Sequence, residues 1–119
     1  MDSKLLVQLA ETYYDLIDKG DLENLLALFR EDVIYERGAI GRISGKQALR
    51  RFFTEERVIS EGRHTLESAV VEGSVIAIQG RFEGILKSGE AVRVRFADFF
   101  RVEDGKIRRR DSYFMDRFL

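Results

Sequence analysis

One carboxylate, Asp98, lies within the stretch RFADFFRV, residues 95–102, together with three phenylalanines. An ionised carboxylate in apolar surroundings is costly, so it normally finds a charged partner, accepts a proton, or lies where ligand or solvent reaches it. Asp98 is therefore either a neutral acid that donates a hydrogen bond to a bound carbonyl group or the partner of Arg110 or Arg81 in a buried ion pair. The two arginines expected on its sheet face favour the ion pair.

Three further side chains are candidates for acid–base or anion-binding chemistry. Tyr13 either donates its hydroxyl to a ligand or packs in the core with the hydroxyl bonded locally, and packing is the commoner role at such a position. His64 is the single histidine and shares a strand face with Leu66 and Val70. It is either a general base near neutral pH or a hydrogen-bonded wall residue. Arg37 either binds an anion at a pocket mouth or, as is more usual, is a solvated loop residue.

Tyr13 is expected to lie on an N-terminal helix. Apolar residues recur at helical spacing up to Ile17, and Gly20 follows where a helix closes in the left-handed conformation. Asp21 is expected to cap a second helix, whose apolar stripe packs against the first.

A third helix is expected after a short strand at residues 33–36 and the loop RGAIGRISG. Ser44 and Gln47 have the spacing of a capping box at its start. Ala48, Leu49, Phe52 and Phe53 then supply its apolar face.

From residue 62 onward, strand patterns of about ten residues alternate with the turns EGS, KSGE and EDGK. This predicts an antiparallel meander, with Gly105 forming a bulge in the last turn. The expected fold is α+β: three N-terminal helices packed on one face of a strongly curved, mainly antiparallel sheet.

The two faces of this sheet are expected to differ. Pairing across KSGE places Gln79 opposite Asp98, and pairing across EDG places Arg110 opposite Asp98. The face under the helices then lines a pocket, with ligand-binding candidates Arg37, Gln79, Arg81, Phe96, Arg110, Ser112 and Phe114. The other face is apolar and carries Ile76, Ile78, Phe82, Ala97, Phe99, Tyr113 and Met115. It predicts a homodimer through the outer sheet face, unless the C-terminal residues fold back over it.

The composition limits the partners. The 119 residues suit one domain, 1–119, and no apolar run is long enough to cross a membrane. A net charge of −1 gives no general attraction to nucleic acid, and the side chains of KIRRR, residues 106–110, split between two strand faces. With one histidine and no cysteine, no metal site is expected, nor does any glycine spacing suggest a nucleotide cofactor. The N-terminus reads as a helix and not an export signal, which indicates the cytoplasm.

The order of elements, together with GDLENLLALFREDVIYE, the loop GAIGRISG before ALRRFF, and FRVEDGKI, is similar to a known family. Across nearly the whole chain it resembles the SnoaL-like and ketosteroid-isomerase-like branch of the nuclear transport factor 2 superfamily. The resemblance implies a conical α+β domain with a pocket between helices and sheet. Isomerases, polyketide cyclases, epoxide hydrolases and many proteins of unassigned activity share it.

The resemblance also implies roles for particular residues. In the ketosteroid isomerases a tyrosine and a protonated aspartic acid form an oxyanion hole, and the matching positions are Tyr13 and Asp98. The position of their carboxylate base is Arg37, which cannot abstract a proton, so that mechanism would need His64 or Glu83 as base.

The epoxide hydrolases of this fold use an arginine between two aspartates. The matching positions are Gln79, Arg81 and Ser112, so both carboxylates are missing. These departures leave two expectations. One is a cofactor-independent isomerase, cyclase or hydratase acting on a small apolar or aromatic carbonyl or hydroxyl compound through Asp98, Tyr13 and His64. The other is a non-catalytic ligand-binding or dimerisation module.

Overall fold

The computed structural model describes residues 1–115 and 119. Helices α1 (Ser3–Lys19), α2 (Leu22–Ala27) and α3 (Lys46–Arg51) pack on a six-stranded sheet. The strands are β1 (Phe29–Arg37), β2 (Gly41–Ser44), β3 (Ile59–Glu72), β4 (Val75–Leu86), β5 (Ala91–Glu103) and β6 (Lys106–Phe114). A short 3-10 turn, η1 (Gly38–Ile40), precedes β2, and a π-helical turn, η2 (Phe52–Glu56), follows α3.

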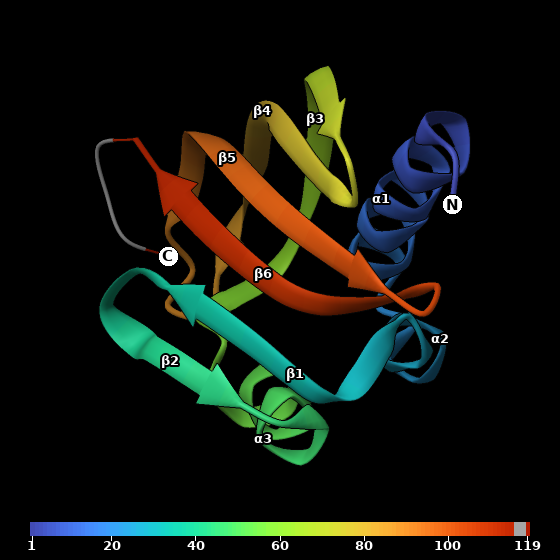
Figure 1. The fold of residues 1–119 in the computed structure, drawn as a ribbon. Coiled ribbons are helices and arrows are strands. Elements are labelled where there is room, and N and C mark those ends of the chain that lie inside the picture. Colours follow the sequence, from blue (N-terminus) through green and yellow to red (C-terminus); the bar gives the residue numbers. More distant parts are fainter. Residues whose placement is uncertain (116–118) are drawn as a thin grey trace.

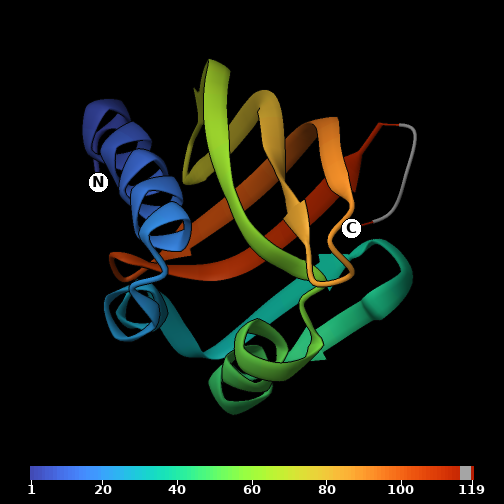
Figure 2. The same ribbon diagram turned by 180° about the vertical axis from the view of Figure 1, so that it is seen from behind.

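The sheet curves strongly, with α1 packed beside β3 at one end and α3 beside β1 and β2 at the other (Figure 1). Figure 2 shows the same arrangement from behind, with β3 bending past α1 toward α3. This is the expected α+β architecture. None of the helices in the described part of the chain combines the length and apolar character needed to cross a membrane.

The helix ends follow the capping residues for α1 and α2. Gly20 adopts φ 74°, and its N–H bonds the carbonyl of Ile17 at 3.2 Å. Asp21 then accepts from the backbone of Asn24, so both predictions are confirmed. The prediction of a capping box at Ser44 is wrong. The N-cap residue of α3 is Gly45, which forms no side-chain cap hydrogen bond.

One strand pairing brings distant segments together. The sheet order is β2-β1-β6-β5-β4-β3, and β1 runs parallel to β6. In this register Tyr35 lies beside Arg110 and Arg37 beside Ser112. Side chains of the N-terminal and C-terminal parts of the chain therefore meet at the centre of the sheet.

The predicted pairing of β4 with β5 is wrong by one residue. Ile78, not Gln79, lies opposite Asp98, because the loop between the strands has three residues, Lys87 to Gly89, instead of the four in KSGE. An odd shift turns every side chain of a strand to the opposite face. Ile76, Ile78 and Phe82 are consequently buried in the core.

The two ligand-binding candidates on β4 are affected by this shift. Gln79 and Arg81 are exposed on the outer face, where Arg81 pairs with Glu67 at 3.5 Å. Glu83, considered as a base, lies on the same face and approaches Arg93 at 3.7 Å. None of the three contributes to the interior.

The predicted pairing of β5 with β6 is wrong by two residues. Ser112 lies opposite Asp98, and Arg110 lies opposite Phe100. An even shift leaves each side chain on its expected face. The register changes between Arg101 and Val102, which places the bulge in β6 and not at Gly105.

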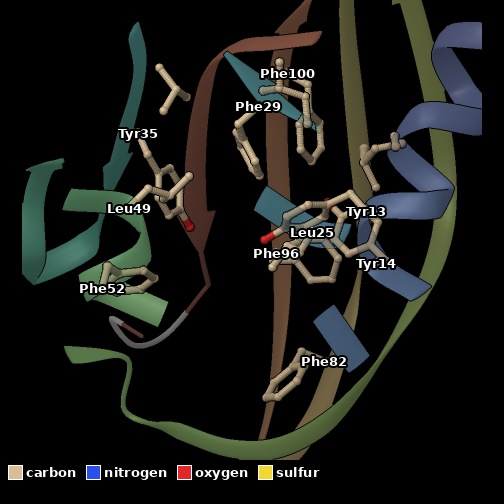
Figure 3. Packing of buried hydrophobic residues seen from close by; sticks show 14 of the residues in the cluster. Tyr13, Tyr14, Leu25, Phe29, Tyr35, Leu49, Phe52, Phe82, Phe96 and Phe100 are labelled. Atoms are coloured by element: carbon tan, nitrogen blue, oxygen red, sulfur yellow. The ribbon is translucent and has the colours of Figure 1, made fainter. Parts of the chain in front are cut away.

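The core is rich in aromatic side chains. Tyr13, Tyr35, Phe29, Phe52 and Phe100 are among its largest fully buried members. In Figure 3 they come from α1, β1, β5 and the segment after α3 and gather around one interior region. The polar groups of the candidate site are buried among these rings.

Candidate functional site

Asp98 is the centre of a buried polar cluster. Its side chain points into the core and is 1% exposed. Tyr14 on α1 donates to Oδ2 and Ser112 on β6 donates to Oδ1. Arg110 donates to Oδ2 at 2.9 Å, so the charge partner of Asp98 is Arg110 and not Arg81.

These contacts determine the protonation state of the carboxyl group. Burial would raise the pKa of Asp98, but the charge of Arg110 and the hydrogen bonds from Ser112 and Tyr14 bring it below its ordinary value. Burial and the nearby carboxylate raise the pKa of Tyr14, which keeps its proton and remains a donor. Asp98 is therefore an ion-paired acceptor and does not donate to a carbonyl group.

A chain of hydrogen bonds extends this cluster toward β1. Arg37 donates to the hydroxyl oxygen of Tyr35 at 2.9 Å, and that oxygen lies 2.8 Å from Oγ of Ser112. Ser112 has a single hydroxyl proton, which it gives to Asp98, so the Tyr35 hydroxyl must donate to Ser112. The proton positions along the chain are thereby fixed from Arg37 to Asp98.

Tyr13 lies at the other end of this hydrogen-bond network, beyond Arg110. Its hydroxyl oxygen accepts from Nη1 of Arg110, and among the described residues nothing accepts the Tyr13 proton. The tyrosine is 2% exposed, and burial raises its pKa, so the proton stays on the oxygen. Tyr13 is thus a buried hydroxyl group whose proton has no acceptor among the described residues.

His64 forms a second polar pair beside the cluster. Its Nδ1 lies 2.6 Å from Oδ1 of Asp18, and its backbone N–H donates to the other oxygen of that carboxylate at 2.8 Å. A proton on Nδ1 leaves Nε2 as an acceptor, with no partner for it in residues 1–115 or 119. The imidazole packs between aromatic rings, 4.7 Å from Phe82 and 5.0 Å from Tyr14 between centroids.

We expect His64 to titrate below the ordinary histidine pKa of about 6.5. Burial lowers its pKa, and the opposing effect of Asp18 does not fully compensate. The chain has one histidine, so proton NMR can follow its ring resonances against pH without ambiguity. A midpoint above 6.5 would show that the carboxylate outweighs burial.

The lowered pKa of His64 also determines how the free energy of unfolding changes with pH. Where the pH lies between the folded pKa of His64 and about 6.5, the unfolded chain binds more protons, so the free energy of unfolding falls as the pH decreases. Urea denaturation at pH 7.5, 6.0 and 5.0 should show this loss. It should be smaller in His64→Gln.

Three pockets open from the surface around the cluster, and two of them are lined by its residues. One of about 590 Å³ opens beside Arg57, and its lining combines apolar residues, among them Leu25, Phe53, Ile59 and Phe82, with the charged residues Asp18, Lys19, Glu61 and Lys87. A smaller one, of about 310 Å³, is lined by Arg37, Ser112 and Phe114 near the C-terminal end of β6. A third, of about 560 Å³, runs between α1 and β3 past Tyr14 and His64.

The structure brings together most of the residues selected from the sequence. Asp98, Tyr13, Arg37, Phe96, Arg110 and Ser112 are buried, and Phe114 lies beside Arg37. His64 lies next to them, with its ring 5.4 Å from that of Phe96. Gln79 and Arg81 alone among the ten candidates lie on the outer face.

Four residues of this region were missed. Tyr35 shares the inner face of β1 with Arg37, so strand alternation could have indicated it. Tyr14 follows Tyr13 and is also buried, although the expected helical stripe included Tyr13 alone. Asp18 and Arg57 carry no local signal, because their positions depend on how α1 and the segment after η2 pack.

Comparison with known proteins gives a family. The sequence model of the SnoaL-like domain matches residues 10–110. No curated protein matches the chain.

Solved structures similar to this one share the fold. An NTF2-like protein of unknown function from Burkholderia pseudomallei is 20% identical, with a TM-score of 0.85 over 96% of this chain and 92% of that one. An epoxide hydrolase of the LEH-like type from M. tuberculosis is 17% identical, with a TM-score of 0.81 over 93% and 83%. A candidate polyketide cyclase from Pseudomonas putida is 26% identical, with a TM-score of 0.76 over 91% and 90%.

Proposed function

Because the chain belongs to the SnoaL-like domain family, we propose that it binds a small, largely apolar molecule that carries a carbonyl or hydroxyl oxygen. The observation that carries this proposal is the Tyr13 hydroxyl, a buried donor without an acceptor among the described residues. Buried donors are normally satisfied, so an unused one indicates a ligand or water in the functional state. The apolar side chains in the lining of the pocket beside Arg57, among them Phe53 and Phe82, suit the body of such a molecule.

The activity we propose is acid–base turnover without a cofactor: isomerisation, cyclisation or hydration. Tyr13 would donate to the substrate oxygen as negative charge develops there. His64, neutral at pH 7 because burial lowers its pKa, would take up or return a proton at Nε2 while Asp18 orients the ring. Asp98 acts indirectly, by holding Arg110 and Tyr14 in place.

One observation favours a second function, that of a non-catalytic binding module. Asp98 is ion-paired, and a position that ketosteroid isomerases fill with a protonated acid is here an acceptor already bonded by three side chains. The cluster can then organise the interior without chemistry. Turnover assays on compounds that bind would separate the two functions.

A thermal-shift screen of ketones, lactones and phenols tests the binding proposal. We expect at least one class to raise the melting temperature of the wild type, and Tyr13→Phe to remove most of that rise. Tyr113→Phe is the matched control, because that tyrosine lies exposed on the outer sheet face. A rise that survives in Tyr13→Phe would count against Tyr13 as the donor, and no rise for any compound would count against binding.

A homodimer through the outer sheet face remains part of the proposal. Phe99, Tyr113 and Met115 are exposed there, with the rings of Phe99 and Tyr113 in edge contact at 6.0 Å. Charged residues flank them, since Arg95 pairs with Glu67 on the same face. The patch is smaller than expected, because three of its predicted members lie in the core.

A further inference from the structure

Three arginine side chains, Arg37, Arg57 and Arg110, interact with one or both of two buried tyrosines, Tyr13 and Tyr35. The guanidinium carbon of Arg110 lies 4.3 Å from the ring centre of Tyr13 and 4.6 Å from that of Tyr35. Arg37 donates to the Tyr35 hydroxyl at 2.9 Å. Arg57 interacts electrostatically with both tyrosines and with both other arginines.

The positive charge of this region exceeds its negative charge. Arg37 and Arg110 are 4% and 3% exposed, and Asp98 is the one buried carboxylate among the described residues. Asp98 neutralises Arg110. Arg37 and Arg57 are then left without a carboxylate partner among the described residues. Burial and the charge of Arg37 lower the pKa of Arg57 to about 10, so it is still a cation at neutral pH.

The same arginines carry unused hydrogen-bond donors. Nε and Nη2 of Arg37, Nε of Arg57 and Nε of Arg110 are buried and have no hydrogen-bond partner among residues 1–115 and 119. Buried guanidinium groups are normally both paired and hydrogen-bonded, because an isolated charge is costly to desolvate. Surplus charge and surplus donors at one place indicate that an anion completes the site.

We propose that Arg57 binds the carboxylate group of a small organic acid whose apolar body occupies the pocket that Arg57 lines, while Arg37 adds to the positive charge of the region. This inference rests on the proposed function and names the class of molecule that is bound. A guanidinium group presents parallel N–H donors that match the two oxygens of a carboxylate. Nε of Arg57, which has no hydrogen-bond partner among the described residues, lies on one such edge.

The surroundings favour an organic acid over an inorganic anion. The pocket of about 590 Å³ falls in the range of ordinary ligand sites. Leu25, Phe53, Ile59 and Phe82 line it near Arg57. Arg37 itself is held between the rings of Phe52 and Phe114, at 5.2 Å and 5.0 Å. These apolar side chains suit a hydrocarbon or aromatic body, which a free phosphate ion lacks.

Calorimetric titration at pH 7.5 with acids and their uncharged amides tests the inference. The pairs are phenylacetate with phenylacetamide, cinnamate with cinnamamide, and 2-naphthoate with 2-naphthamide; inorganic phosphate is titrated separately. We expect at least one acid to bind the wild type tenfold or more tightly than its amide. The reason is that the amide cannot form the charge-assisted hydrogen bonds that the carboxylate forms with a guanidinium group.

Arg57→Gln should reduce that preference about tenfold. Lys87→Gln is the matched control, because Lys87 is an exposed cation at the rim of the same pocket and its loss should change the preference little. Without ligand, Arg57→Gln should melt at the same temperature as the wild type or higher, because it removes an uncompensated charge. A purely structural Arg57 would give a lower melting temperature instead.

The outcomes separate this inference from the function on which it rests. Amides or neutral ketones that bind as tightly as the acids would overturn the carboxylate inference and leave small-molecule binding standing. Binding of phosphate without any acid would overturn it as well. If neither acids, amides nor neutral oxygen compounds bind, the proposed function fails and the inference fails with it.

Discussion

Replacing Asp98 with asparagine is expected to lower the free energy of unfolding by about 3–5 kcal/mol, because removal of one partner leaves the other charge buried and unpaired. The stranded group is Arg110, which is 3% exposed and bonded to Asp98 at 2.9 Å. The surplus of positive charge around it makes the loss of the carboxylate more costly still. Urea denaturation at pH 7.5, followed by circular dichroism, measures the change.

Two further variants separate the ion pair from ordinary surface charge. Asp98→Asn combined with Arg110→Met should recover much of the loss, since the unpaired charge is removed together with its partner. Glu67→Gln should cost no more than about 1 kcal/mol, because its pairs with Arg81 and Arg95 are partly exposed. A cost for Asp98→Asn as small as that of Glu67→Gln would show that water reaches the Asp98 carboxylate.

The pH dependence of the free energy of unfolding tests the Asp98–Arg110 ion pair independently. The pKa of Asp98 is lower in the folded protein than in the unfolded chain, so its contribution to stability is complete above about pH 4. It is lost as the pH falls through the folded pKa. Wild type and Asp98→Asn should therefore differ fully at neutral pH and converge in strong acid.

Strand alternation was sufficient to identify the inner residues of β5 and β6. Phe96, Asp98 and Phe100 alternate in one strand and Arg110 and Ser112 in the next, and all five are buried as expected. The register error of two residues did not matter here, because an even shift preserves the face.

The same reasoning failed where it depended on the length of a loop. A loop of three residues in place of four moved Gln79 and Arg81 to the outer face and took Ile78 into the core. Local sequence does not distinguish these two loops, since both use Ser88 and Gly89. Faces assigned within a strand are therefore more secure than faces assigned across a turn.

Long-range packing accounts for the remaining residues of the site. Tyr35 and Arg37 meet Arg110 and Ser112 because β1 pairs with β6 in parallel, across some seventy residues of intervening chain. Nothing in either segment specifies that pairing. Arg57 directly follows the π-helical turn η2, which occupies a segment where a regular third helix was expected.

Gly80→Ala is expected to destabilise the fold by about 2–3 kcal/mol, which lies within the usual cost of overpacking a close-packed interior. A Cβ at this position would lie 2.4 Å from the carbonyl oxygen of Thr65 and 2.9 Å from the ring of Phe96. Gly80 pairs with Leu66 on one side and with Phe96 on the other, so the backbone cannot move without disturbing both neighbouring strands.

The displaced ring would also reach the candidate site. Phe96 lies 5.6 Å from Tyr14 and 5.4 Å from His64 between ring centroids, so Gly80→Ala should change the chemical shifts of the histidine ring as well as the stability. Gly73→Ala is the comparison, because a Cβ there has open space and meets only the strain of φ 59°. We expect it to cost about 1 kcal/mol, the penalty of a left-handed backbone, and to leave the histidine signals in place. Equal costs for the two variants, with unchanged histidine signals in both, would show that the Phe96 ring moves aside freely and that the interior beside Gly80 is not closely packed.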